Sequence, residues 1–452
     1  MELRPYQRED AEQIKRYRCY GIFNEQRTGK TPTAITVVSE KNLHKVLILC
    51  PKSTVYTWAE EYTLWSRGKP AIVIVGSPQK RANLLKGWKE GAVVMSYDTL
   101  KTTSNSAGMI DMVLQHNPDG VIADEAHRFK NTSSKVFQAM KRLMNVPYRY
   151  ALTGTPAHGK PEEIFAILHW LFPKRFTGYW KFIDEFFVKR REVLQNGRSF
   201  INIVGFQPGG DVRLQKLLSQ LSVQRKRSEV MPWLPKKDYQ DIKLPLTDKQ
   251  IKYLAELKEY FETEEVVVQG ILDRLIRYRQ VCLHPGLLAL SGDSPKLSWL
   301  LDYINDYPDT PTIVFTKFTS FIKLVEKELI DKKISFGTII GETPAADRKQ
   351  FVDEFQNGKI NLLLVNIDAG KEGLTLDRGE CIIFTDQYPP SSDIQQAEDR
   401  FVATTEYKAD KPHKIIRLMM KGSYDEQVYK LVQQRASMTD LLNDYKKYLE
   451  RR

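Results

Sequence analysis

The sequence lacks the features that mark secreted, membrane-spanning and zinc-binding proteins. Its four cysteines, Cys19, Cys50, Cys282 and Cys381, lie far apart and form no metal-ligand spacing with the seven histidines. This pattern indicates reduced thiols and no structural zinc. No apolar run approaches the roughly 20 residues that span a bilayer, and the N-terminus has no apolar core behind a basic patch, so neither an anchor nor a secretory signal is predicted. We therefore expect a soluble, cytoplasmic protein with no membrane partner.

Acidic residues are fewer than basic ones. Lys and Arg number 68 against 56 Asp and Glu, a net charge of +12. The excess favours a polyanionic partner, because phosphates bound by a protein release their counterions. A generally basic surface explains the same count, so composition leaves both interpretations open.

Short apolar runs alternate with helical stretches in two parts of the chain. Runs this short and continuous are typical of strands buried on both faces, and hence of parallel sheets covered by helices. They lie at 45–50, 71–76, 92–97, 120–123 and 149–153, and again at 312–315, 335–340, 361–366, 381–385 and 414–419. The pattern predicts an α/β fold with two doubly wound parallel-sheet domains.

The residues between the two series have a different character. Aromatic and basic helical patterns dominate there, over 172–191, 213–227 and 248–280. Prolines near 231–237 stop helices and stiffen the connection, which predicts a hinge. We expect a first domain over 1–230, with a helical insertion from about residue 171, and a second over 231–452. The second would hold the hinge, insertion helices to about residue 300, and C-terminal helices.

Residues 24–31, Asn-Glu-Gln-Arg-Thr-Gly-Lys-Thr, are typical of a phosphate-binding loop. Backbone N–H groups of such a loop and of the following helix point at the anion, while Lys30 pairs with the β/γ-phosphate oxygens and Thr31 ligates Mg²⁺. The full pattern has a glycine where this chain has Asn24, a residue that tolerates a positive φ. The candidate nucleotide contacts are Thr28, Gly29, Lys30 and Thr31. Taken alone, the segment is also consistent with an ordinary helix start.

An acidic pair strengthens that interpretation. Asp124 and Glu125 follow the apolar run 120–123. An Asp at the end of a buried strand holds a metal ion, and the next Glu polarises water. Two carboxylates at a buried strand end have no evident structural purpose. Together the two motifs predict a site that binds ATP and Mg²⁺ and hydrolyses ATP, with Lys30, Asp124 and Glu125 as catalytic residues.

With these motifs the chain resembles the Swi/Snf-type ATPases of helicase superfamily 2, over nearly its whole length. Arg4-Pro-Tyr-Gln7 is similar to the adenine-contacting element of the family, and Ala126-His-Arg-Phe-Lys-Asn131 is close to specific for this branch. Other family motifs resemble residues 47–53, 93–100, 152–156, 279–285, 341–348, 368–376 and 395–400. The resemblance implies two RecA-like domains and a minimal form of the family, from a phage or a bacterium.

The resemblance also implies roles for single residues. The amide of Gln7 matches the adenine edge, although a solvated glutamine is the alternative, and Gly373 joins the nucleotide contacts. His127 would couple the acidic motif either to motif III or to the second domain. The remaining coupling residues are Thr153, Thr155 and Gln396. The two threonines either link the γ-phosphate to the nucleic acid or simply cap helices.

Arg400 is the candidate arginine finger, a cation that neutralises charge on the γ-phosphate from the facing domain. The family usually has a second arginine three residues later, where this chain has Ala403. Arg400 is therefore either the finger or a structural arginine.

Contacts to a duplex backbone are implied for residues of both domains. They are Lys52, Ser53, Tyr97, Thr99, Lys130, Asn131, Thr316, Lys317 and Thr375. Backbone contacts without base readout suit a motor that steps along any sequence. For each residue alone, a solvated surface role is an equal alternative.

The leading interpretation is an ATP-dependent motor that moves along double-stranded DNA. A short member of the family could remodel forked or four-way DNA by branch migration, in recombination, replication or repair. An RNA helicase is one alternative, which the extended acidic motif and the large insertion argue against. A nucleic-acid clamp with a vestigial ATPase is the other, which Asn24 and Ala403 keep open.

Overall fold

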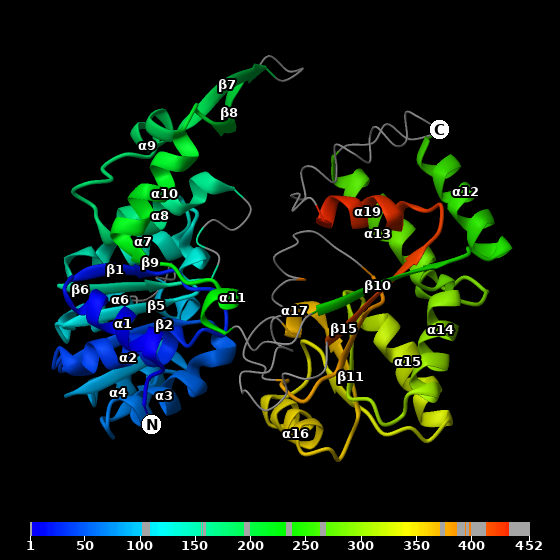
Figure 1. Ribbon diagram of the computed structural model, residues 1–452, viewed down its shortest axis with the longest axis horizontal. Coiled ribbons are helices and arrows are strands. Elements are labelled where there is room, and N and C mark those ends of the chain that lie inside the picture. The colour runs from blue at the N-terminus through cyan, green and yellow to red at the C-terminus, as the bar shows by residue number, and fades with distance from the viewer. Residues whose placement is uncertain are drawn as a thin grey trace. The chain divides into compact units, whose positions relative to one another are not determined.

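The computed structural model describes residues 2–101, 109–154, 156, 160–193, 199–231, 237–262, 268–370, 376–386, 394, 397–398 and 413–433. By its internal contacts the chain divides into two compact units, Met1–Pro232 and Trp233–Arg452 (Figure 1). No helix in the described ranges is long and apolar enough to cross a membrane.

The first unit is built on a parallel sheet. In its described part the strand order is β3-β4-β2-β5-β6-β1-β9. The strands are β1 Cys19–Ile22, β2 Lys45–Cys50, β3 Ala71–Val73, β4 Gly91–Ser96, β5 Gly120–Asp124, β6 Tyr148–Leu152 and β9 Ser222–Val223. Strand β2 shows why the apolar runs are continuous: Leu47 and Leu49 join the core on one face, and Val46 and Ile48 join the core on the other. Both faces are therefore buried, as in doubly wound folds.

Helices cover both faces of this sheet. Those with residues in one core are α1 Pro5–Lys15, α2 Lys30–Glu40 and α3 Val55–Trp65. Those in the other are α4 Pro78–Lys86, α5 Tyr97–Leu100, α6 Met109–Gln115, α7 Lys135–Arg142, α8 Ile164–Leu171, α9 Tyr179–Phe186 and α10 Gly210–Leu221. Short helical turns add η1 Lys52–Thr54, η2 Ala126–Phe129, η3 Leu143–Asn145, η4 Pro161–Glu163 and α11 Arg227–Val230.

The predicted insertion is not wholly helical. The pattern at 172–191 predicts helix throughout, but an antiparallel hairpin of β7 Phe187–Val193 and β8 Ser199–Phe206 starts within it. Figure 1 shows this hairpin extending from the end of α9. Several of its apolar side chains, among them Phe200 and Ile201, are exposed.

The second unit repeats the architecture. Its described strands are all parallel and follow the order β10-β15-β14-β11-β13-β12. They are β10 Lys237–Leu244, β11 Thr312–Thr316, β12 Gly337–Ile339, β13 Leu362–Asn366, β14 Cys381–Phe384 and β15 His413–Met420. The helical elements are α12 Asp248–Glu262, α13 Val268–Leu283, η5 Pro285–Leu288, α14 Pro295–Asp306, α15 Thr319–Asp331, α16 Ala345–Gln356, α17 Ile367–Gly370 and α19 Tyr424–Gln433. The prediction of two doubly wound parallel-sheet domains is confirmed.

Candidate functional site

Three strands of the first unit end at the same edge of the sheet. Leu152 at the end of β6 pairs in register with Ile22 of β1 on one side and with Asp124 of β5 on the other. Because neighbouring strands lie about 4.8 Å apart, the ends of β1 and β5 are separated by about 10 Å. The loop after β1, the acidic pair after β5 and Thr153 after β6 therefore meet at the carboxyl edge, where doubly wound sheets bind ligands.

The loop after β1 leads directly into the N-terminus of α2. Gly29 is the N-cap, in the left-handed region with φ 76°. A Cβ at this position would lie 1.9 Å from Gln7 Nε2, so a side chain here would displace Gln7, and the positive φ favours glycine. Gln7 is buried and donates to Thr28 O at 3.1 Å, which supports the loop from α1. Lys30 and Thr31 follow as the first two residues of α2. The contact of Gln7 with adenine stays a prediction.

The lysine of the loop is held by backbone carbonyls. Lys30 Nζ donates to Asn24 O and to Glu25 O, both at 3.0 Å. Asn24 does not use its tolerance of a positive φ, because the left-handed residues of this segment are Arg27, with φ 63°, and Gly29. Asn24 instead donates its Nδ2 to Asp10 Oδ2 at 2.7 Å, with both side chains buried.

Asp124 is positioned by two aromatic residues from other elements. Trp58 of α3 donates its Nε1 to Asp124 Oδ2 at 2.8 Å, and Tyr97 donates its hydroxyl to Asp124 O at 2.6 Å. Burial, followed by the charge of Glu125, raises the pKa of Asp124 to about 6. A carboxylate whose charge is penalised in this way gains from a nearby cation.

The backbone turns sharply after Asp124. Glu125 has φ 48° and ψ 51°, a left-handed conformation that is costly for a residue with a Cβ and is often found at functional sites. His127 Nδ1 lies 3.2 Å from Thr153 Oγ1 and 3.3 Å from Glu125 Oε2. The structure thus brings the acidic motif into contact with the residue after β6, while the coupling role of His127 and Thr153 stays a prediction.

The donor set suits a magnesium ion. Among the described residues no group of three or more His, Cys, Asp and Glu could hold a metal ion. Mg²⁺, however, usually takes one or two protein oxygens and completes its shell with phosphates and water. The Thr31 hydroxyl at a helix N-terminus and the Asp124 carboxylate at a strand end are such oxygens, so these residues fit the ion.

The predicted DNA contacts of the first unit fall into two groups. Lys52 and Ser53 of η1, at the end of β2, and Asn131, after η2, are exposed. Lys130 is half-buried and pairs with Glu163 at 2.9 Å. The other two predicted contacts, Tyr97 and Thr99, belong to α5.

The hydroxyl groups of both α5 residues are hydrogen-bonded within the protein. Tyr97 is only 3% exposed and its hydroxyl is engaged with Asp124 O, so its placement argues against the predicted contact with a DNA phosphate. Thr99 lies with its Oγ1 3.0 Å from Ser96 Oγ, in the turn that starts α5.

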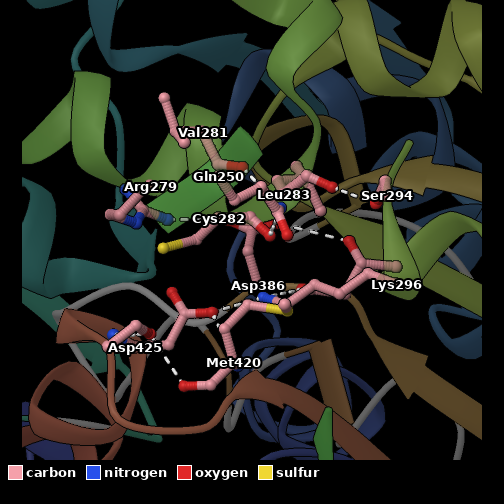
Figure 2. A network of polar contacts seen from close by, with 12 residues as sticks. Gln250, Arg279, Val281, Cys282, Leu283, Ser294, Lys296, Asp386, Met420 and Asp425 are labelled. Atoms are coloured by element: carbon pink, nitrogen blue, oxygen red, sulfur yellow. Dashed lines mark hydrogen bonds and ion pairs between the residues drawn. The ribbon is translucent and has the colours of Figure 1, made fainter. Parts of the chain in front are cut away.

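In the second unit, a buried ion pair organises the end of β11 (Figure 2). Arg279 Nη2 lies 2.7 Å from Asp386 Oδ2, and both side chains are buried. Asp386 Oδ1 accepts from Thr316 Oγ1 at 2.7 Å and from Lys317 N at 3.1 Å. Thr316 is therefore a buried partner of Asp386, against its predicted contact with DNA, while Lys317 projects its Nζ to Asp368 Oδ2 at 2.5 Å.

Some of the predicted site lies outside the described residues. This applies to the nucleotide contact Gly373, the DNA contact Thr375, the coupling residues Thr155 and Gln396, and the finger candidate Arg400 with its neighbour Ala403.

Sequence reasoning missed the residues that hold the site from a distance. Trp58 of α3 lies outside any predicted motif, and Asp10 lies on α1 three residues beyond the motif that ends at Gln7. No local signal therefore marks their contacts. For Asp10 a weak signal existed in Asn24, since a buried amide in place of a glycine needs a partner.

Comparison with known proteins gives consistent matches over the chain. The SNF2-related domain matches residues 13–287, and the helicase conserved C-terminal domain matches residues 295–402. The SWI/SNF chromatin-remodeling complex subunit snf22 of Schizosaccharomyces pombe is 26% identical over 447 residues, which cover 90% of this chain and 26% of that protein. The DNA annealing helicase and endonuclease ZRANB3 of Bos taurus is 25% identical over 460 residues, which cover 96% of this chain and 40% of that protein. This chain thus spans well under half the length of these relatives.

Among solved structures, the Sulfolobus solfataricus SWI2/SNF2 ATPase core in complex with dsDNA is similar, with 21% sequence identity and a TM-score of 0.45. The match covers 96% of this chain and 91% of that chain.

Proposed function

The chain belongs to the SNF2-related family, and on that premise we propose that it is an ATP-driven motor that moves along double-stranded DNA and remodels it. The observation that carries the proposal is the carboxyl edge of the first sheet. There the loop that presents Lys30 and the acidic pair Asp124 and Glu125 meet through their common register with Leu152. Lysine, hydroxyl and two carboxylates are the groups that phosphoryl transfer to water requires.

Each residue of this edge has a task in hydrolysis. Lys30 exchanges the carbonyls of Asn24 and Glu25 for phosphate oxygens when ATP binds. Thr31 and Asp124 would hold Mg²⁺, which neutralises charge on the phosphates when it is bound. Glu125 orients the attacking water and takes its proton. Arg400 would supply a second cation, and Gly373, Thr155 and Gln396 belong to the same proposal on the resemblance of their motifs alone.

The DNA would follow predicted contacts at the strand ends. In the first unit the exposed ones are Lys52, Ser53 and Asn131. In the second unit Lys317 is half-buried and would exchange its pair with Asp368 for a phosphate. Thr375 joins them by its motif. The net charge of +12 supports a partner rich in phosphates.

Branch migration is the finer form of the proposal. It rests on the relative named as a DNA annealing helicase, with which 96% of this chain aligns. A motor that pulls duplex arms without reading bases can move a junction as readily as it slides on a linear duplex.

One assay separates the proposal from its alternatives. We expect ATP hydrolysis by the purified chain to be stimulated most by duplex DNA and four-way junctions, less by single strands and least by RNA. Stimulation by RNA above duplex DNA would favour an RNA helicase. Tight DNA binding with no hydrolysis under any condition would favour the clamp with a vestigial ATPase.

A further inference from the structure

Residues 222–227, here called the strap, run beside the phosphate-binding loop within the first unit. The strap begins as β9, which pairs in parallel with the end of β1. The backbone pairing continues beyond both strands, since Phe23 N donates to Val223 O at 2.9 Å and Glu25 N donates to Arg225 O at 3.0 Å. The backbone at the start of the loop, at Phe23 and Glu25, is therefore hydrogen-bonded to the strap.

Side chains tie the same segments together. Asp10 of α1 accepts from Asn24 Nδ2 at 2.7 Å with one oxygen and from Arg225 Nε at 2.9 Å with the other. Asp10 is 0% exposed, and its burial raises its pKa even though both hydrogen bonds lower it. A buried carboxylate is costly, and an apolar contact would pack α1 against the sheet as well. Because Asp10 accepts hydrogen bonds from both the loop and the strap, its carboxylate joins these two segments, which an apolar side chain would not do.

The bridged residues are the ones that hold the lysine of the site. Lys30 donates to the carbonyls of Asn24 and Glu25. When a phosphate takes the ammonium group, Asn24 O loses this donor and Glu25 O keeps the Thr28 hydroxyl, which lies 2.8 Å away. The start of the loop then relies more on Asp10 and the strap for its position, while Gln7 still supports Thr28.

The strap also leads straight to the end of the first unit. Glu25 Oε2 accepts from the backbone N–H of Arg227, the first residue of α11, at 2.8 Å. Met231 follows α11 and is buried, and the first unit ends at Pro232. The loop is therefore linked to the end of the first unit through one short helical turn.

Resting on the proposed ATP-driven function, we infer that Asp10 and Arg225 are positioning residues of the nucleotide site. They hold the phosphate-binding loop in shape through Asn24. They also pass its displacement on ATP binding along the strap to the connection between the units.

The test uses the full chain with Asp10→Asn, Arg225→Ala and Arg225→Lys. Arg142→Ala is the matched control, because Arg142 also pairs with a carboxylate, Asp111, but lies at the end of α7 that leads to the opposite edge of the sheet. Three quantities are measured: affinity for a non-hydrolysable ATP analogue with Mg²⁺, KM and kcat of ATP hydrolysis with duplex DNA, and the factor by which the analogue changes duplex affinity.

Arg225→Ala and Asp10→Asn should each weaken analogue binding and raise KM about tenfold, because a displaced loop loses its alignment with the phosphates. The factor by which the analogue changes duplex affinity should fall toward one, while duplex affinity without nucleotide stays unchanged. Arg225→Lys should recover part of both effects, and the control should match the wild type.

Lower melting temperatures with wild-type KM and an unchanged coupling factor would overturn the inference, because the strap would then be only structural. A wild-type chain without DNA-stimulated hydrolysis would count against the proposed function instead. Analogue affinity would still test the loop in that case, and equal affinities of wild type and Arg225→Ala would overturn the inference as well.

Discussion

At the scale of single residues, Lys30 and Glu125 should fail in different ways when they are replaced. Lys30→Ala removes the ammonium that pairs with the phosphates, so ATP affinity and hydrolysis should both fall. Glu125→Gln keeps the loop and Asp124 but removes the base, so ATP should bind with near wild-type affinity and persist, with kcat reduced about 10²- to 10⁴-fold. Nucleotide binding and single-turnover hydrolysis measure the two steps separately. Robust turnover by Glu125→Gln would remove Glu125 from the catalytic role.

The raised pKa of Asp124 predicts that the stability of the nucleotide-free protein depends on pH. Its pKa is raised from 3.8 to about 6 in the folded state, so between these values the folded chain holds a proton that the unfolded chain releases. The contribution of Asp124 to the free energy of unfolding therefore falls as pH rises from about 4 to 6. Above pH 6 the charged carboxylate destabilises the folded state. Asp124→Asn should stabilise the protein by about 1–2 kcal/mol at pH 7.5 and by little at pH 4.5.

Chemical denaturation at the two pH values measures this difference, with the exposed Asp98→Asn as control. The same substitution should abolish Mg²⁺-dependent hydrolysis. Equal destabilisation at both pH values would show that the carboxylate is needed for packing and that its charge is not penalised.

The sequence marks the proposed catalytic residues far better than the residues that contact them from other elements. Lys30 and the acidic pair stand in contiguous motifs, so their chemistry is visible in a few neighbouring letters. Trp58 contacts Asp124 across 66 residues of sequence. Arg225 contacts Asp10 across 215 residues. Such contacts depend on how distant elements pack together in the folded unit, and local sequence patterns carry no information about that packing.

At the scale of elements, most buried parallel strands were predictable because burial on both faces leaves a continuous apolar run. The four-residue strand β1 and the partly exposed strand β10 were not predicted. The hairpin of β7 and β8 was not predicted either, since Val-Lys-Arg-Arg-Glu-Val in β7 is rich in residues that also favour helices. These residues form a strand because they pair with β8, and a search for helical periodicity within β7 takes no account of that pairing. The edge strand β9, two residues long, escaped for the same reason.

The polar network at the ends of β14 and β15 provides the prediction at this scale (Figure 2). Lys296 of α14 is 1% exposed and donates to Asp425 Oδ2 at 2.6 Å and to Thr385 O at 2.9 Å. It joins α14 to the start of α19 and to the end of β14. Lys296→Met should destabilise the second unit by about 3–5 kcal/mol, because the Asp425 charge is left buried without its partner.

Denaturant unfolding of Lys296→Met measures the loss. The double variant Lys296→Met/Asp425→Leu should recover most of it, since no charge then remains buried. Lys243→Met is the matched control: its pair with Glu426 at 3.0 Å is exposed, so its loss should cost less than about 1 kcal/mol. An effect of Lys296→Met as small as that of the control would show that the pair contributes little.

At the scale of the whole molecule, the fold has two units of one architecture, joined in sequence by the strap, α11 and the residues that follow. The proposed roles of Lys30 and the acidic pair in the first unit and of Arg400 in the second would make hydrolysis a property of both units. A motor needs this division, because alternate grip by two units is what converts ATP turnover into movement along a track.

Movement and its electrostatic grip can be tested together. DNA affinity should fall steeply with salt and vary little with sequence, because the contacts are to phosphates. Lys52→Ala in the first unit and Lys317→Ala in the second should each weaken binding equally for all sequences and make the logarithmic salt slope shallower by about one. Lys86→Ala is the control, since it removes the same charge at the end of α4 that leads to the opposite edge of the sheet.

ATP-dependent displacement of a third strand from a triplex should be slowed by the first two variants and unchanged in the control. A chain that hydrolyses ATP on duplex DNA but displaces no third strand and moves no four-way junction would contradict the motor and favour the clamp.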